Sequence, residues 1–132
     1  SGPLMDRIDL HVEVDSVSFS DLNDKVSEES SASIKERVNK ARKIQLERFN
    51  SSSHFSNAQM NHAQTKKYCT LSKECEDLLE TAFNSLNLSA RAYDRILKVA
   101  RTIADLEGEL CILPQHIAEA IQYRSLDRKY WV

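Results

Sequence analysis

Apolar and polar side chains alternate strictly over residues 8–14. Ile8, Leu10, Val12 and Val14 are apolar, and charged or polar side chains stand between them. A period of two predicts a β-strand with one buried face. A single strand has no partner for its backbone hydrogen bonds. We therefore expect residues 1–30 to be the edge of a larger sheet domain and to be mobile without that domain.

Beyond residue 30 the apolar positions recur with the period of a helix. This pattern predicts a helix over 31–49, a short polar helix over about 58–66, and a strongly amphipathic helix after Ser72. Two glycines and two prolines in 132 residues are too few for a β-sandwich, a β-barrel or a doubly wound sheet. The expected fold is therefore mainly α.

The ends of the last two helices are marked by residues that favour helix boundaries. Ser89 is placed to cap a helix that Gly108 ends, and Pro114 suits the first turn of the final helix. A basic and aromatic tail follows over 124–131. We expect residues 31–132 to form one helical domain, a bundle of about four helices, behind the N-terminal segment 1–30.

Two arginines are placed where a phosphate could bind. Arg7 precedes the predicted strand, where apolar neighbours would hold its planar guanidinium in position. The alternative for Arg7 is a surface ion pair with Asp6 or Asp9. Arg91 lies in the first turn of the helix after Ser89, where a cation is unfavourable unless an anion is bound there too. The alternative for Arg91 is a solvated helix face.

Charge is distributed unevenly along the chain, although the formal net charge is only −2. Residues 31–49 hold six Lys or Arg against two Glu, whereas residues 6–29 hold eight Asp or Glu against two basic residues. Such a split is typical of contacts between subunits or with nucleic acid, and a solvated helix face is the alternative. The candidate nucleic-acid contacts are Lys35, Lys40, Arg42 and Lys43.

Other kinds of chemistry are disfavoured by the sequence. It contains no GxxxxGK[ST] loop and no HExxH motif, so we do not expect the chain alone to hydrolyse a nucleotide. His54, His62, Cys69 and Cys75 match no standard zinc spacing, so we expect no metal site. Three cysteines without a CxxC pair, together with no visible signal peptide or membrane span, predict a cytoplasmic protein.

Three stretches resemble magnesium-chelatase-like AAA+ ATPases, in particular their bacterial YifB/ComM branch. Residues 1–14 read SGPLMDRIDLHVEV and resemble the segment after the sensor-1 strand. Residues 88–106 read LSARAYDRILKVARTIADL and resemble the sensor-2 helix of the lid domain. Residues 116–124, HIAEAIQYR, resemble the end of that lid. The resemblance implies that residues 1–30 end an AAA+ core and that residues 31–132 form the helical lid.

The same resemblance implies roles for three arginines. Arg7 matches the arginine finger, which stabilises the charge on the transferred γ-phosphoryl group. Arg91 matches the sensor-2 arginine, and Arg95 is a further candidate nucleotide contact. ATP and Mg²⁺ would be the cofactors of the full-length parent, an ATPase, whereas this chain alone would bind neither tightly and would not be an enzyme.

The implied partners are neighbouring subunits of a homo-oligomeric, hexameric ring and DNA, with no membrane; the isolated chain would be a monomer. The YifB/ComM branch implies ATP-driven branch migration of DNA during recombination of incoming DNA, and SNAQM at 56–60 favours this branch. One alternative is the motor subunit of a magnesium-chelatase-type metal insertion complex. The other is a non-enzymatic helical interaction module.

Overall fold

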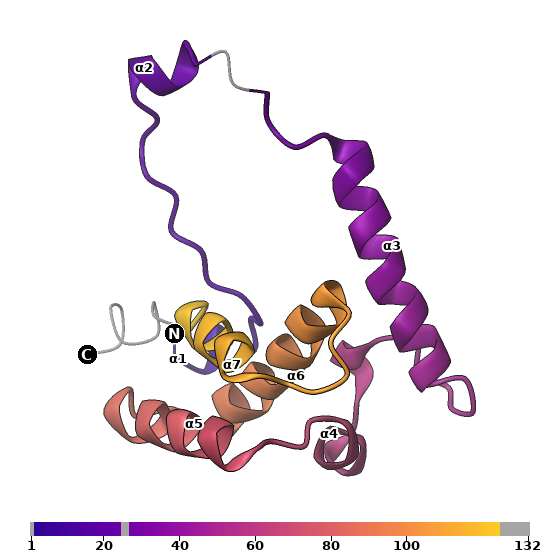
Figure 1. Cartoon of the computed structure of the whole chain (residues 1–132). Helices are drawn as coiled ribbons and strands as arrows, with labels where there is room; N and C mark the ends of the chain where they lie inside the picture. Colours follow the sequence, from indigo (N-terminus) through magenta and orange to yellow (C-terminus); the bar gives the residue numbers. More distant parts are fainter. Residues whose placement is uncertain (1, 25–26, 125–132) are drawn as a thin grey trace.

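The computed structural model describes residues 2–24 and 27–124 (Figure 1). Its elements, in chain order, are α1 (Gly2–Met5), α2 (Phe19–Leu22), α3 (Ser31–Arg48), the 3-10 turn η1 (Asn57–Gln59), α4 (His62–Tyr68), α5 (Lys73–Ser85), α6 (Ala90–Glu107) and α7 (Pro114–Gln122). No β-strand occurs within the two described ranges. The prediction of a mainly α fold is confirmed; positions 125–131 of the predicted basic tail lie outside the described residues.

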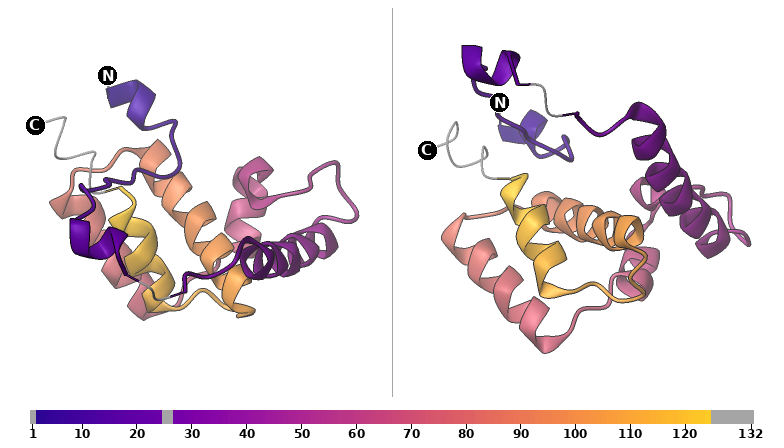
Figure 2. Two further views of the ribbon diagram at one scale, coloured as in Figure 1. Left: turned by 90° about the horizontal axis from the view of Figure 1, so that it is seen from above. Right: turned by 45° about the horizontal axis from the view of Figure 1, so that its top comes forward.

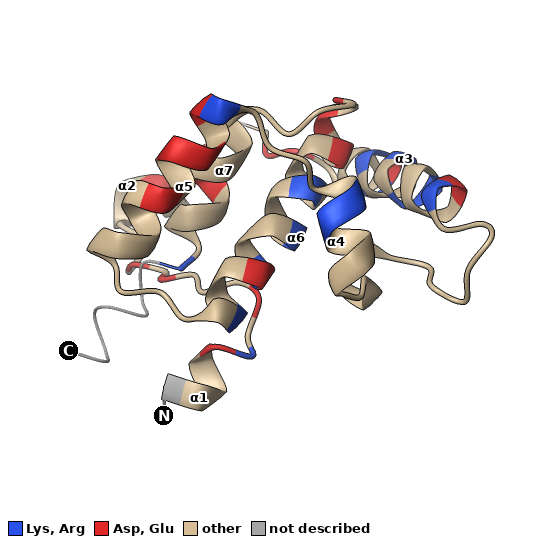
Figure 3. Ribbon diagram, turned by 90° about the horizontal axis from the view of Figure 1, so that it is seen from below, with Lys and Arg blue, Asp and Glu red and all other residues tan. Residues whose placement is uncertain are grey.

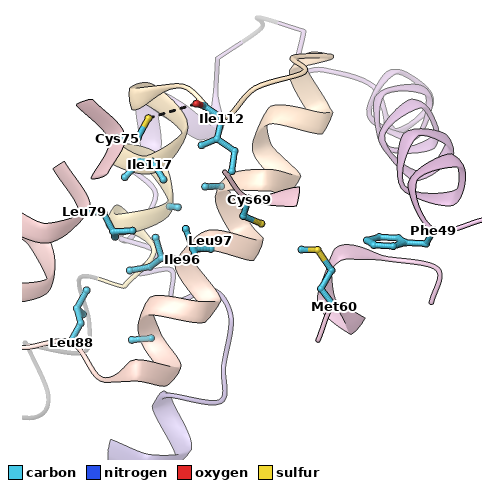
Figure 4. Packing of buried hydrophobic residues seen from close by; sticks show 13 residues of the cluster. Phe49, Met60, Cys69, Cys75, Leu79, Leu88, Ile96, Leu97, Ile112 and Ile117 are labelled. Carbon is cyan, nitrogen blue, oxygen red and sulfur yellow. Dashed lines mark hydrogen bonds between the residues drawn. The ribbon is translucent and has the colours of Figure 1, made fainter. Parts of the chain in front are cut away.

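Helix α6 is the centre of the helical body. It packs against α3, α4, η1 and α7, and α7 also packs against α5 (Figures 1 and 2). Figure 4 shows the buried side chains that these helices share, with the Cys75 thiol directed at the carbonyl oxygen of Ile112, 3.6 Å away. The buried cluster comprises Phe49, Met60, Cys69, Cys75, Leu79, Leu88, Ala92, Ile96, Leu97, Ala100, Ile112, Ile117 and Ala120.

The predicted helix boundaries after residue 70 are confirmed. The side-chain oxygen of Ser72 accepts a hydrogen bond from the backbone N–H of Cys75, and Ser89 accepts one from Ala92, so both serines cap a helix. Gly108 ends α6 with a φ of 73°, a left-handed conformation that glycine adopts without strain. The polar helix predicted over 58–66 divides into η1 and α4, because Asn61 and Gln64 form a capping box that starts a new helix at His62.

The strand predicted over residues 8–14 does not form. The segment has no partner strand in the described part of the chain, so no ladder of hydrogen bonds can build on it. Its apolar side chains face solvent instead; the side chain of Val14 is 84% exposed. Residues 12–24 run away from the helical body, whereas residues 5–11 lie against it (Figures 1 and 2).

Buried polar groups join helix α3 to α6. The guanidinium of Arg48 donates two hydrogen bonds to the carboxylate of Asp105, at 2.7 and 2.8 Å. Asn57 donates to the same carboxylate at 2.8 Å, and the Nε of Arg101 lies 3.2 Å from it. A bidentate pair of this kind fixes the orientation of both helices. We call Arg48, Asn57, Arg101 and Asp105 the buried network.

Candidate functional site

Arg91 lies in the first turn of α6, as the sequence predicted. Ser89 is the N-cap of α6, which begins at Ala90. No acidic side chain lies in the first turn to balance the helix dipole. Arg91 is exposed. Its guanidinium therefore adds a positive charge beside backbone N–H groups that already favour an anion.

Arg7 lies in a tight turn directly after α1. The backbone N–H of Arg7 donates to the carbonyl oxygen of Leu4, and that of Ile8 donates to Met5, both at 3.1 Å. The turn leaves the Arg7 side chain exposed. The acidic neighbours proposed as its alternative partners are directed elsewhere. Asp9 forms an ion pair with Arg95, and Asp6 lies 3.9 Å from Arg124.

The structure brings Arg7, Arg91 and Arg95 together around one open hollow of about 540 Å³. Arg7 comes from the N-terminal turn and the other two arginines from successive turns of α6, so the site joins segments more than 80 residues apart. Figure 3 shows the segment after α1 passing the first turns of α6, with blue positions on both. The remaining lining residues are Met60, His62, Ala90 and Asp94.

The electrostatics of this hollow favour an anion. The described lining residues bring three guanidinium groups and one carboxylate, that of Asp94, which is itself 3.2 Å from the ammonium of Lys98. Asp9 offsets the charge of Arg95 from outside the lining, so the balance stays positive. Guanidinium groups stay charged at any physiological pH and match phosphate oxygens with paired N–H donors. The arrangement can bind and polarise a phosphate, and the described residues that line the hollow include no hydroxyl or thiol nucleophile.

Arg95 has a second task in this site. Its Nη1 lies 2.6 Å from a carboxylate oxygen of Asp9, and the Arg95 side chain is 29% exposed. This ion pair ties the N-terminal turn to α6. One end of the Arg95 fork is thus engaged within the chain, whereas Arg7 and Arg91 are presented outward.

The candidate nucleic-acid contacts lie elsewhere on the molecule. Lys35, Lys40, Arg42 and Lys43 are all exposed on α3, and Lys40 makes an i,i+4 pair with Glu36 at 3.4 Å. Helix α3 lies on the opposite side of the helical body from α1 (Figures 1 and 2). The structure therefore does not bring these four residues together with the three arginines of the hollow.

The histidines and cysteines do not assemble into a metal site. No group of three or more His, Cys, Asp or Glu side chains that could hold a metal ion occurs among residues 2–24 and 27–124. Cys69 is buried, and burial raises the pKa of its thiol to about 11. In the described part of the chain no helix is both long enough and apolar enough to cross a lipid bilayer.

Sequence reasoning missed one residue that shapes this site. Arg124 follows α7 and is buried, with its guanidinium donating to backbone carbonyl oxygens of the N-terminal turn. A signal for it was present, because Ile117, Ile121 and Arg124 recur at i, i+4 and i+7. That spacing continues the inward-facing stripe of α7 and marks Arg124 as an inward position.

Comparison with known proteins places this chain in a family. The family model described as "Magnesium chelatase, subunit ChlI C-terminal" matches residues 28–124. Competence protein ComM of Haemophilus influenzae is 44% identical over 129 residues, which is 97% of this chain and 25% of that protein. Protein YifB of Escherichia coli is 41% identical over the same shares. A Mycobacterium bovis protein, Mb2921c, is 30% identical over 125 residues.

The chain thus spans about a quarter of the length of the curated relatives it matches. The family match includes α3 to α7, and the alignments with ComM and YifB cover 97% of the chain. On this evidence, the chain belongs to the family of magnesium chelatase ChlI C-terminal domains and, within it, to the ComM/YifB group.

Proposed function

We propose that this chain is the lid part of an AAA+ ATPase motor and that Arg7 and Arg91 act together on the phosphates of ATP. The observation that carries the proposal is that the two arginines line one hollow. Membership of a magnesium-chelatase-like family supports an ATP- and Mg²⁺-using parent. In this assignment Arg7 is the arginine finger and Arg91 the sensor-2 arginine.

The hollow suits one half of a phosphate site. It offers positive charge at a helix N-terminus, and Asp94, the carboxylate among its described lining residues, is paired with Lys98. The loop that cradles the phosphates and the carboxylates that hold Mg²⁺ would come from the rest of the full-length protein. Because the hollow opens outward, we propose that it faces the ATP of a neighbouring subunit in a homo-oligomeric, hexameric ring.

DNA is the substrate we propose for this motor. The 44% identical relative is the competence protein ComM, and we infer from it a motor for branch migration of incoming DNA in the bacterial cytoplasm. The exposed basic residues of α3, Lys35, Lys40, Arg42 and Lys43, are the proposed DNA contacts. They lie apart from the arginine hollow, so one surface can hold DNA while the other responds to ATP (Figure 1).

A metal-insertion motor is the second candidate, because the matching family is described by magnesium chelatase. Both candidates share the same ATP chemistry and differ in the substrate. A DNA-stimulated ATPase rate in the purified full-length protein would favour the recombination motor. A rate that ignores DNA but rises with a porphyrin-binding partner would favour the chelatase motor.

The decisive experiment replaces Arg7 by Ala in the full-length protein. We expect ATP turnover to fall by about 10³-fold or more, the range for an arginine finger, with the fold intact because the side chain is exposed. Arg37→Ala is the matched control. It removes an exposed arginine paired with Glu29 outside the hollow, so turnover should stay at the parental rate.

Mixed rings test whether Arg7 acts across a subunit boundary. Arg7→Ala subunits are mixed with subunits whose phosphate-cradling loop is inactivated, and neither type hydrolyses ATP alone. Activity should return wherever an intact finger meets an intact pocket. If Arg7→Ala hydrolyses ATP at the parental rate, the finger assignment is wrong.

A further inference from the structure

We infer that Arg124 is a positioning residue for Arg7: its buried guanidinium holds the N-terminal turn against α7, so that Arg7 and Arg91 present to the same phosphate as one rigid unit. This inference rests on the proposed role of Arg7. It assigns a function to a side chain that contacts no part of the hollow itself.

Burial is the first observation that requires an explanation. The Arg124 side chain is only 1% exposed, and arginine is among the residue types that are almost never fully buried unless paired. Removing a guanidinium from water is destabilising unless protein acceptors satisfy its donors. The buried Arg124 guanidinium therefore needs acceptors within the protein, and the acceptors that it finds show which part of the chain it holds in place.

The contacts of Arg124 bracket Arg7. Its Nη1 donates to the carbonyl oxygen of Ile8, and its Nη2 donates to that of Met5 at 3.3 Å. The carboxylate of Asp6 lies 3.9 Å from the same nitrogen. The guanidinium therefore reaches the residues immediately before and after Arg7, and it fixes both ends of the turn that carries the finger.

A planar fork suits this task better than a point charge. The two acceptors are carbonyl oxygens three residues apart, and the two terminal nitrogens of one guanidinium reach both at once. A lysine ammonium has no planar fork, so the substitution loses the paired, oriented hydrogen bonds that define the turn. Arginine is therefore required at position 124 because the shape of the turn presents two carbonyl oxygens to one guanidinium.

Two further contacts hold the same segment. The backbone N–H of His11 donates to the carbonyl oxygen of Tyr123, the residue before Arg124, at 2.9 Å. On the other side of the turn, Asp9 pairs with Arg95 of α6 at 2.6 Å. Residues 5–11 are therefore tied both to α6, which carries Arg91, and to the end of α7. Arg7 lies in the middle of this tied segment.

Holding Arg7 in position before the reaction begins should affect kcat. An arginine finger acts on charge that develops in the transition state, so its benefit depends on its position before the reaction begins. A displacement of about 1 Å in a positioning group can cost about 10²-fold in rate. Loss of Arg124 should therefore lower kcat and leave the KM for ATP nearly unchanged, because ground-state binding depends on other groups.

The test compares Arg124→Met and Arg124→Lys in the full-length protein, each in the wild-type and in the Arg7→Ala background. We expect Arg124→Met to lower kcat by about 10- to 100-fold with KM within about twofold, and Arg124→Lys to recover part of the loss. In the Arg7→Ala background Arg124→Met should change kcat by less than twofold, since a positioning residue has nothing left to position.

A purely structural role would move other readouts. It would lower the fraction of active, folded protein while each active subunit kept its kcat, and it would act equally in both backgrounds. That result would overturn the inference. If Arg7→Ala alone leaves turnover at the parental rate, the proposed function fails; if Arg7→Ala is inactive but folded Arg124→Met is fully active, only the positioning role fails.

Asp9→Asn covers the case in which Arg124 variants do not fold. The Asp9 side chain is 45% exposed, so its replacement leaves the core intact while it weakens the second attachment of the same turn. We expect a fall in kcat of a few-fold at unchanged KM, and no effect in the Arg7→Ala background. An equal fall in both backgrounds, or no fall at all, would contradict a positioned finger.

Discussion

Two basic regions of this molecule hold their charges in opposite ways. Around the hollow, Arg7 lies in a hydrogen-bonded turn, Arg91 follows a capped helix start, and Arg95 is fixed by Asp9. On α3 the four candidate DNA contacts, Lys35, Lys40, Arg42 and Lys43, are exposed, and the ion pair of Lys40 with Glu36 is of the weak surface kind.

The difference teaches what each region can recognise. A few guanidinium groups on a tied scaffold can match one phosphate group in one geometry, which is what catalysis of phosphoryl transfer requires. A row of mobile cations along a helix instead attracts any polyanion and gains affinity by releasing counterions. Arginines dominate the first region and lysines are numerous in the second, in keeping with these tasks.

The largest expected effect is a loss of folding stability when the buried network that links α3 to α6 is disrupted. Asp105→Asn removes the charge that neutralises Arg48 and Arg101 in the buried network, where the Asp105 side chain is 1% exposed. We expect a loss of about 3–5 kcal/mol in the free energy of unfolding, measured by urea denaturation. Asp77→Asn is the control: its pair with Lys73 is exposed and should cost under about 0.5 kcal/mol. Equal losses would show that α3 does not depend on the network.

The next largest effect is a loss of ATP turnover in variants of Arg91, which test whether a fixed geometry matters in the arginine hollow. Arg91→Ala in the full-length protein should lower ATP turnover by about 10²-fold, the range for loss of one transition-state donor. Arg91→Lys keeps the charge but not the fork, so it should recover only part of the rate. A lysine variant with full activity would mean that Arg91 acts as a simple charge, in the manner of α3.

A smaller effect is expected for the diffuse region. Reversing the charge in Lys40→Glu/Lys43→Glu should weaken DNA binding by about tenfold or more and reduce the slope of log K against log salt by about 2. Basal ATP turnover should remain. Lys73→Glu makes the same kind of charge reversal at one position of the acidic helix α5 and should leave DNA affinity nearly unaltered. A salt slope unchanged by the α3 variant would remove α3 from the DNA surface.

The smallest expected effect is a pH dependence of folding stability caused by Cys69 in the buried cluster. Burial raises the pKa of Cys69 from 9.0 to about 11, so the folded state resists ionisation of the thiol above pH 9. Stability from this group is complete below pH 9 and is lost as the pH rises toward 11, by about 1 kcal/mol at pH 10. Urea denaturation at pH 8 and pH 10 should show this loss in the wild type and not in Cys69→Ala. An identical pH dependence in both would mean that Cys69 is accessible to water.

Local chemistry predicted most of the helical body. Ser72, Ser89, Gly108 and Pro114 act within one turn of their own position, so their helix boundaries could be read directly from the sequence. The start of α4 was missed because the Asn61–Gln64 capping box competes with a continuous helix. The strand at 8–14 was wrong because alternation predicts a strand only where a partner strand exists.

The candidate site was predictable only residue by residue. Arg7 and Arg91 could be singled out from their local settings and from the family resemblance, but no sequence pattern states that they share a hollow. The pairing of Asp9 with Arg95 joins positions 86 residues apart, and Arg124 meets Ile8 across 116 residues. Such contacts depend on how α6 and α7 pack, and a single sequence carries no direct record of that packing.

Those long sequence separations also set the order in which parts of the molecule assemble and come apart. Closing the turn at residues 5–9 onto α6 and α7 must wait until both helices are in place, because the loop entropy is lost before any contact repays it. Among the described residues, polar contacts hold this closure, whereas α5, α6 and α7 share a continuous apolar cluster. In hydrogen exchange the turn should open with a smaller free energy than the body beneath it. Mild denaturant would then separate Arg7 from Arg91 while the helices remain folded.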